Sequence, residues 1–161
     1  MKEIQLTQGK VAIVDDEDYK YLNQWKWHTQ ESRPGKFYAA RNISVNGKKK
    51  IELMHRLILK LDTTAIHVDH IDNDGLNNTR KNIRACNNTE NQRNTSKRIN
   101  NKSGFKGVSW HKLQKKYQAH ISDNNSRLIY LGRFTCPIEA ARAYNAAALI
   151  HHGEFARLNE I

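Results

Sequence analysis

The chain has 161 residues, 38% of them apolar, which is enough for one large domain or two small ones. Its 27 lysines and arginines outnumber 16 acidic residues, and the formal net charge is +11. A chain this basic is expected to bind a polyanion, most often nucleic acid; lysines that only keep a surface solvated are the alternative.

Cysteine content and apolar runs exclude two further classes of protein. Cys86 and Cys136 are the two cysteines, so neither a disulfide framework nor a four-cysteine zinc site can form. The opening MKEIQLTQGK lacks the apolar segment of a signal peptide, and no run approaches the roughly 18 apolar residues of a membrane span. We expect a cytoplasmic protein.

Residues 1–54 are expected to form short strands. A strand at 10–14 would end in an acidic turn at 15–18, one or two helical turns would follow at 19–24, and residues 25–28 alternate as a strand does. Residues 37–45 and 48–54 would pair through the Asn46-Gly47 hairpin turn. This segment holds ten basic and seven acidic residues, so we interpret it as a support for the rest of the fold rather than as a DNA-facing sheet.

Residues 54–59 are apolar enough for a short helix. Two nearby histidines could be either structural residues or ligands. A lone histidine before an apolar run, such as His55, is more often structural than a ligand. His67 would share a strand face with Asp69 and could approach a metal or a phosphate. We assign neither histidine to a site.

The stretch HVDHIDNDGLNNTRKNIRACNNTENQRN, residues 67–94, concentrates residues suited to metal-assisted chemistry on a phosphate. Asp69 is a hard oxygen ligand and His70 a candidate general base. Asn82 can hydrogen-bond an imidazole, and Asn91 can offer a second oxygen to a metal. The same composition also suits a polar loop between two strands.

Secondary structure in this stretch is expected to be strand, loop, strand and helix. The strands would be residues 68–71 and 83–86, with Asn73-Asp74-Gly75 opening the loop. Asn88 or Thr89 would cap a helix that starts at Glu90 and carries Asn91 and Asn94 on one face.

These residues resemble the motif of HNH homing endonucleases of phages and introns, and the likeness extends to LTQGKVAIVDDEDYKYL and MHRLIL. The resemblance implies a ββα-metal finger as the fold of this stretch. It also implies that the protein acts in a phage-infected or bacterial cell. Asp69 and Asn91 would hold one divalent metal, His70 would be the base, and Asn82 would fix the His70 ring. Many members of the family have histidine where this chain has Asn91, and Asn94 is the alternative ligand to Asn91. Asp69 and Asn91 supply only oxygen ligands, which suits Mg²⁺ or Mn²⁺.

A basic run follows from Arg93 to Lys116, with a small, polar segment at residues 100–104 that is typical of a linker. No acidic residue lies between Glu90 and Asp123. Lysines and arginines of this run can follow a phosphate backbone, and an inert solvated linker is the alternative. The predicted DNA contacts in the run are Lys97, Arg98 and Lys102.

The remaining residues predict three strands and one helix. The strands are expected at 105–110, 116–122 and 128–134. Thr135 would cap a helix over IEAARAYNAAALIHH, and Gly153 would end it. The expected inward face of the helix comprises Ile138, Ala141, Tyr144, Ala148 and Leu149.

The segments SGFKGVSW, KKYQAHI, YLGRF and EAARAYNAAAL resemble the APETALA-type DNA-binding domain of ethylene-response factors. In that family the sheet enters the major groove, so the resemblance implies base and phosphate contacts from the strands. Several family arginines are serine or histidine here, so the target sequence cannot be carried over. The positions that match the family's contacts are Lys106, Ser109, His111, Tyr117, His120 and Ser122.

Together these features predict an α+β chain with two domains. Residues 1–99 would form an HNH nuclease with a β-rich support, and residues 100–161 a three-stranded antiparallel sheet packed on one helix. The expected function is metal-dependent, site-specific hydrolysis of phosphodiester bonds in double-stranded DNA by a monomer. A catalytically inactive, sequence-specific DNA-binding protein is the alternative; a zinc-dependent base deaminase would need a Cys-x-x-Cys pair, which is missing.

Overall fold

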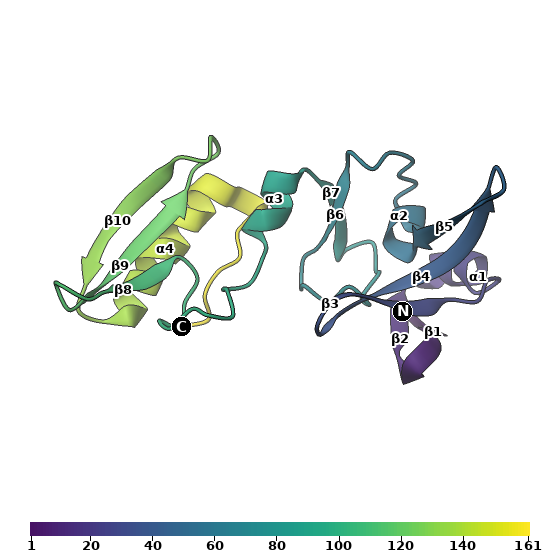
Figure 1. Cartoon of the computed structure of the whole chain (residues 1–161), viewed down its shortest axis with the longest axis horizontal. Coiled ribbons are helices and arrows are strands. Elements are labelled where there is room, and N and C mark those ends of the chain that lie inside the picture. The colour runs from purple at the N-terminus through teal and green to yellow at the C-terminus, as the bar shows by residue number, and fades with distance from the viewer. The chain divides into compact units, whose positions relative to one another are not determined.

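A computed structural model describes all 161 residues as a mixed α+β chain with four small antiparallel sheets and few helices. The chain divides into two units, Met1–Asn91 and Gln92–Ile161 (Figure 1). The division falls within the short helix α3 (Asn88–Arg93), before the boundary at 99/100 that the sequence predicts. Each unit is described by itself.

The first unit begins with a two-stranded sheet of β1 (Lys2–Gln5) and β2 (Val11–Val14), with the 3₁₀ turn η1 (Thr7–Gly9) between them. Helix α1 (Asp16–Leu22) follows at once. The acidic residues predicted to form a turn are its first turn, where carboxylates favour the positive end of a helix. The prediction of a helix starting at residue 19 was therefore three residues late.

A three-stranded sheet of β3 (His28–Arg33), β4 (Lys36–Val45) and β5 (Lys48–Leu53) forms the middle of this unit, and helix α2 (Met54–Ile58) follows β5. The sequence had predicted that Trp25 and Trp27 lie within a strand. In the structure both precede β3, which begins at His28. The Trp27 indole is buried and donates to the carbonyl of Leu22, so it belongs to the core.

One apolar cluster holds the first unit together, drawing on both sheets, α1, α2 and the strand β7 (Ile83–Cys86). Strand β6 (His67–His70) pairs antiparallel with β7 as a separate two-stranded sheet. Burial of apolar side chains is the main favourable term in folding, so this shared core fixes β6 and β7 against the rest of the unit. The buried members of the cluster include Ile4, Ala12, Val14, Leu22, Trp27, Ala39, Met54, Ile58 and Ile83.

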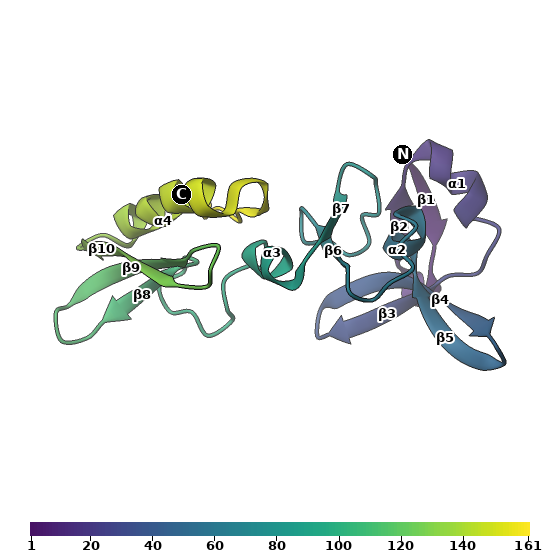
Figure 2. The same cartoon turned by 90° about the horizontal axis from the view of Figure 1, so that it is seen from above.

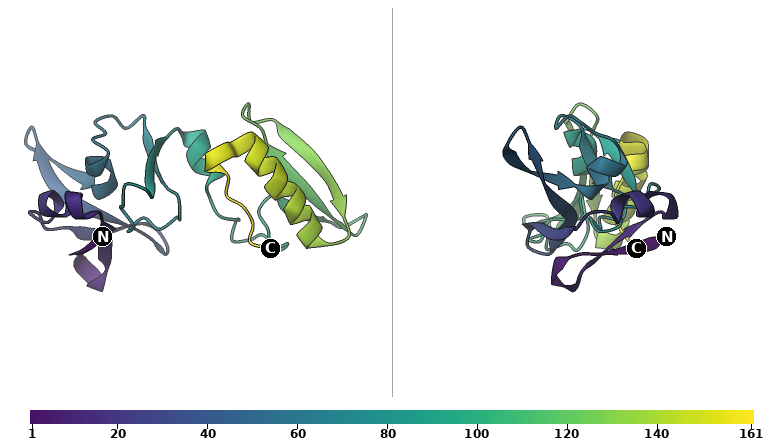
Figure 3. Two further views of the ribbon diagram at one scale, coloured as in Figure 1. Left: turned by 180° about the vertical axis from the view of Figure 1, so that it is seen from behind. Right: turned by 90° about the vertical axis from the view of Figure 1, so that its right-hand side faces the viewer.

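The second unit is a sheet of β8 (Val108–His111), β9 (Lys116–Ser122) and β10 (Leu128–Phe134), in the order β10-β9-β8. Helix α4 (Pro137–His152) lies along one face of this sheet (Figure 3), and the 3₁₀ turn η2 (Gly153–Phe155) follows it. No helix in the chain has the length and apolar character needed to cross a membrane.

Details of α4 differ from the prediction. Cys136 occupies the N-cap position instead of Thr135. Ile138 and Leu149 are 42% and 57% exposed, so they lie off the buried face. The buried stripe contains four alanines, which allow a close approach of helix and sheet; its members are Ala140, Ala141, Tyr144, Ala147, Ala148 and His152.

Candidate functional site

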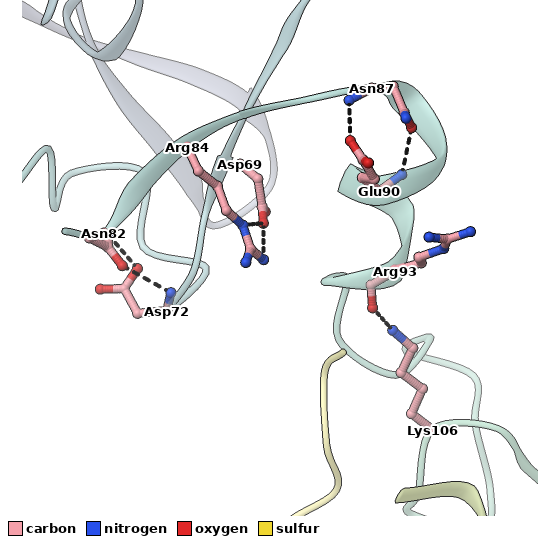
Figure 4. Close-up of polar contacts among 8 residues, drawn as sticks. All are labelled: Asp69, Asp72, Asn82, Arg84, Asn87, Glu90, Arg93 and Lys106. Carbon is pink, nitrogen blue, oxygen red and sulfur yellow. Dashed lines mark hydrogen bonds and ion pairs between the residues drawn. The ribbon is translucent and has the colours of Figure 1, made fainter. Parts of the chain in front are cut away.

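The central pair of the site, Asp69 and His70, ends strand β6, and each side chain is 4% exposed. Asp69 lies opposite Arg84 of β7 in the strand register. Both Nε and Nη2 of Arg84 donate to Oδ2 of Asp69, at 2.9 and 2.7 Å (Figure 4). The buried carboxylate therefore has a charged partner, as a buried charge requires.

Two rings pack against the His70 imidazole. The imidazole of His55, from α2, lies edge-on to it with a centroid separation of 5.0 Å, and Tyr38 of β4 lies 5.8 Å from it. Tyr38 also contacts His55, at 5.6 Å. Sequence reasoning missed Tyr38 and treated His55 as structural, because these contacts join residues far apart in the chain.

Burial lowers the pKa of His70, while a bond from Asn78 and the charge of Asp72 oppose that shift. Burial also lowers the pKa of His55, to about 3, with the charges of His70 and Arg56 acting in the same direction. Both imidazoles are therefore neutral near pH 7. A neutral histidine can accept a proton, which is what a general base must do.

The expected bond between Asn82 and the His70 ring is absent. The Asn82 side-chain oxygen instead accepts from the backbone N–H of Asp72, and its amide nitrogen donates to Asp72 Oδ1 (Figure 4). The same nitrogen also donates to the Asn77 carbonyl. Asn78 Oδ1 is the amide oxygen next to His70, 3.5 Å from Nε2. Asn78 is fully buried and lies next to the His70 ring, where the sequence had placed Asn82.

The loop between β6 and β7 is fastened to the start of the chain. The backbone N–H of Asn78 donates to the Ile13 carbonyl, and Ile13 donates to Leu76. Arg80 donates through two nitrogens to the carboxylate of Asp18. The acidic start of α1 thus holds the loop that carries Asn78, which gives residues 1–22 a supporting role.

Helix α3 carries the remaining proposed ligand. Asn87 Oδ1 accepts from the Glu90 N–H, and Glu90 Oε2 accepts from the Asn87 N–H (Figure 4). This reciprocal capping box makes Asn87 the cap, not Asn88 or Thr89 as predicted. Asn91 is partly buried, and Asn94 is 3% exposed.

No group of three or more His, Cys, Asp or Glu side chains is arranged to hold a metal ion. His67 is exposed at the start of β6. A site at Asp69 would therefore depend on amide oxygens, water and phosphate for its other ligands.

Comparison with known proteins adds one finding. The chain is 27% identical over 154 residues to an uncharacterized HNH endonuclease of Acanthamoeba polyphaga mimivirus. The similarity covers 95% of this chain and 76% of that protein, and it supports an HNH-type nuclease. No family model matches the chain, and no solved structure matches it.

In the second unit, the predicted DNA contacts divide between the two faces of the sheet. Val108 and Ala119 pair across the strands and pack on α4, so neighbouring positions point the other way. Tyr117 shares the face of Ala119 and packs against the core, which makes its assignment to the open face wrong. The predicted residues on the open face are Ser109, His111, His120 and Ser122.

Three residues that the sequence reading missed also lie on the open face. Gln118 pairs with Ser109 on one side and with Arg133 on the other, forming one row across the sheet. Tyr130 is 51% exposed and lies 5.3 Å from the His120 ring. The strand alternation around the buried Ala119 and Ile121 could have indicated Gln118.

The lysines of the basic run differ in their contacts within the second unit. Lys106 donates to the carbonyls of Arg93 and Thr95, and burial lowers its pKa to about 8, with Arg157 adding repulsion. Its ammonium group is thus engaged within the second unit, and contact of Lys106 with DNA stays a prediction. Lys97 donates to the Gly104 carbonyl at 2.6 Å but stays exposed, as do Arg98 and Lys102.

Proposed function

We propose that this chain is a homing-type HNH endonuclease that hydrolyses phosphodiester bonds at preferred sites in double-stranded DNA, acting as a monomer. The observation that carries the proposal is the buried, neutral His70 beside the buried Asp69. The likeness to a protein named as an HNH endonuclease supports the same reaction class.

In the proposed reaction His70 accepts a proton from the attacking water, and the new bond forms between the water oxygen and phosphorus. The bond from phosphorus to the leaving 3′ oxygen breaks, and solvent protonates that oxygen. Burial keeps the imidazole neutral and ready to accept the proton. Tyr38 and His55 restrict the ring by packing against it.

Asp69 and Asn91 would hold the divalent metal, with Mg²⁺ or Mn²⁺ favoured. A carboxylate and an amide supply only oxygen, and such hard cations complete their shell with water and phosphate. Bound there, the metal would neutralise charge on the phosphate and stabilise the leaving oxygen. Arg84 holds one oxygen of Asp69, so it must share that carboxylate with the cation.

We also propose that the second unit is an APETALA-type domain that binds DNA through the open face of its sheet. Exposed polar and basic side chains gather there, while α4 covers the other face. Arginine and glutamine can read guanine and adenine through paired hydrogen bonds, which suits Arg133 and Gln118. The exposed Lys97, Arg98 and Lys102 would contact phosphates.

Cleavage of supercoiled plasmid by the full chain tests the nuclease proposal. We expect nicked or linear product with Mg²⁺ or Mn²⁺ and none in EDTA, and a loss of about 10²–10⁴-fold in rate for His70→Ala, the usual contribution of a general base. His151→Ala, in the second unit, is the matched control and should cut normally. Cleavage by His70→Ala at the wild-type rate, or full activity in EDTA, would overturn the proposal.

The second candidate is a DNA-binding protein without nuclease activity. The ion pair between Arg84 and Asp69 favours it, because the guanidinium already occupies the carboxylate that a metal would use. The plasmid assay decides between them, since this candidate shifts DNA in a gel but leaves every plasmid intact with both metals.

A further inference from the structure

The two faces of the β3–β4–β5 sheet differ in charge. Because side chains alternate along a strand, Lys36, Tyr38, Asn42 and Ser44 of β4 share one face. Ser44 pairs with Lys49 of β5, so Lys49 belongs to that face too. We call it the Tyr38 face.

The carboxylates of this sheet lie on the opposite face. Glu31 pairs with Phe37, and Glu52 pairs with Arg41, both odd-numbered positions of β4. Glu52 is neutralised by Arg41 at 2.6 Å, and the Arg41 guanidinium stacks 3.6 Å above the Trp25 ring. The Tyr38 face therefore presents lysines without an acidic side chain from its own strands.

The Tyr38 face is continuous with the candidate active site. Tyr38 itself packs against His70 and His55. At Gly75 in the site loop, an added Cβ would lie 2.3 Å from the Phe37 carbonyl oxygen, so the loop rests directly on β4. Lys36 lies two residues before Tyr38 in β4 and therefore on the same face of the strand.

Away from the site, the same face is open. The β4–β5 hairpin projects from the other elements of its unit (Figure 2). Asn42, Ser44 and Lys49 are exposed, and neither Lys36 nor Lys49 takes part in an ion pair. Ile51 pairs with Asn42 and is 51% exposed, so this face carries one apolar side chain among its polar and basic ones. Lysines without an ion-pair partner beside a site for phosphate chemistry are complementary to a nucleic-acid backbone.

We propose that the Tyr38 face, from Lys36 to Lys49, binds the phosphate backbone of the DNA duplex beside the scissile bond. The inference rests on the proposed nuclease function and adds a DNA contact made by the first unit. Eight residues of strand separate Lys36 from Ser44, which is about 26 Å. At 3.4 Å per base pair, the contact would extend protection over about eight base pairs on one side of the cut.

Strand alternation supplies a matched pair of charge reversals that tests this surface. Lys49 and Lys50 are adjacent and exposed on β5, but Lys50 pairs with Ile43 and faces the other way. Binding of the full chain to duplex DNA in EDTA is measured at several salt concentrations. We expect Lys49→Glu to weaken binding about tenfold at low salt and to reduce the salt slope by about one, whereas Lys50→Glu stays within about twofold of wild type.

The outcomes separate this surface from the proposed function. If the wild-type chain cleaves DNA but Lys49→Glu and Lys50→Glu weaken binding equally, the proposed backbone contact of the Tyr38 face is wrong and the nuclease proposal stands. General electrostatics would then explain both effects. No effect of Lys49→Glu would overturn the proposed contact as well. A wild-type chain that neither binds nor cleaves duplex DNA would overturn both proposals. Circular dichroism of the two variants confirms that each is folded before comparison.

Discussion

His55 is a buried imidazole in contact with the proposed general base, and its Nδ1 has no hydrogen-bond partner. Its pKa falls to about 3 because burial penalises the charged form. The unfolded chain gives the same group its ordinary pKa of about 6.5. Below that pH the unfolded state binds a proton that the folded state does not.

The contribution of His55 to the free energy of unfolding should therefore be fully present above about pH 6.5 and should be lost progressively as the pH drops toward 3. The slope for one such group is about 1.4 kcal/mol per pH unit. We expect His55→Phe to reduce the pH dependence of the free energy of unfolding by the equivalent of about one proton, whatever the stability of the variant at pH 7. Urea unfolding at pH 7, 5.5 and 4 measures it, and parallel slopes for the variant and the wild-type chain would contradict the prediction.

At the residue scale, sequence reasoning works where the chemistry is local. Asp69 and His70 are adjacent, so their strand could be recognised and both are buried together. Asn78 and Asn82 lie in one loop with the same side chain, and only the folded loop distinguishes them. Asp72 captures the Asn82 amide, and burial leaves Asn78 beside His70.

At the scale of elements, strands were easier to predict than helix ends. Strands β7, β9 and β10 have the predicted bounds, since β-branched and aromatic runs end at clear turns. The predicted start of α1 was three residues late, and the predicted caps of α3 and α4 were wrong. For α3 the spacing of Asn87 and Glu90 is a capping-box signal that could have located the cap.

Gly107, the residue just before β8, lies against the Tyr144 ring of α4. Its φ is +75°, and an added Cβ would lie 2.0 Å from Cδ2 of the buried Tyr144 and 2.8 Å from the His120 carbonyl. Gly104 has a similar φ of +82° but nothing within 4 Å. The two glycines thus share backbone strain and differ in packing.

We expect Gly104→Ala to lose about 1–2 kcal/mol, the cost of a left-handed backbone for an L-residue. Gly107→Ala should lose clearly more, because the Tyr144 ring must move as well. Thermal unfolding of the two full-length variants provides the measurement. Equal losses would show that the ring yields freely and that this contact does not determine the position of the helix.

At the scale of the whole molecule, the structure divides into two units at 91/92, whereas the sequence places the domain boundary at 99/100. The segment at 100–104 was interpreted as a linker because its residues are small and polar. In the structure Asn101 accepts from the N–H groups of Ser103 and Gly104, and Ser103 donates to the Val108 carbonyl. Lys106 holds the carbonyls of Arg93 and Thr95, so residues 92–106 belong to the second unit.

Residues 92–161 should therefore fold alone and bind duplex DNA without cutting it. The unit holds twelve basic and four acidic residues, a net charge of +8, and it lacks the proposed catalytic histidine. Arg133 lies on the open face of the sheet and is the residue tested. Arg142, exposed on α4, is its matched control. We expect Arg133→Ala to weaken binding by about 1–3 kcal/mol if it contacts a base, and Arg142→Ala to change it little. Circular dichroism and gel shifts of the fragment are the measurements; equal effects of the two substitutions, or a folded fragment without affinity at low salt, would contradict DNA binding by this sheet.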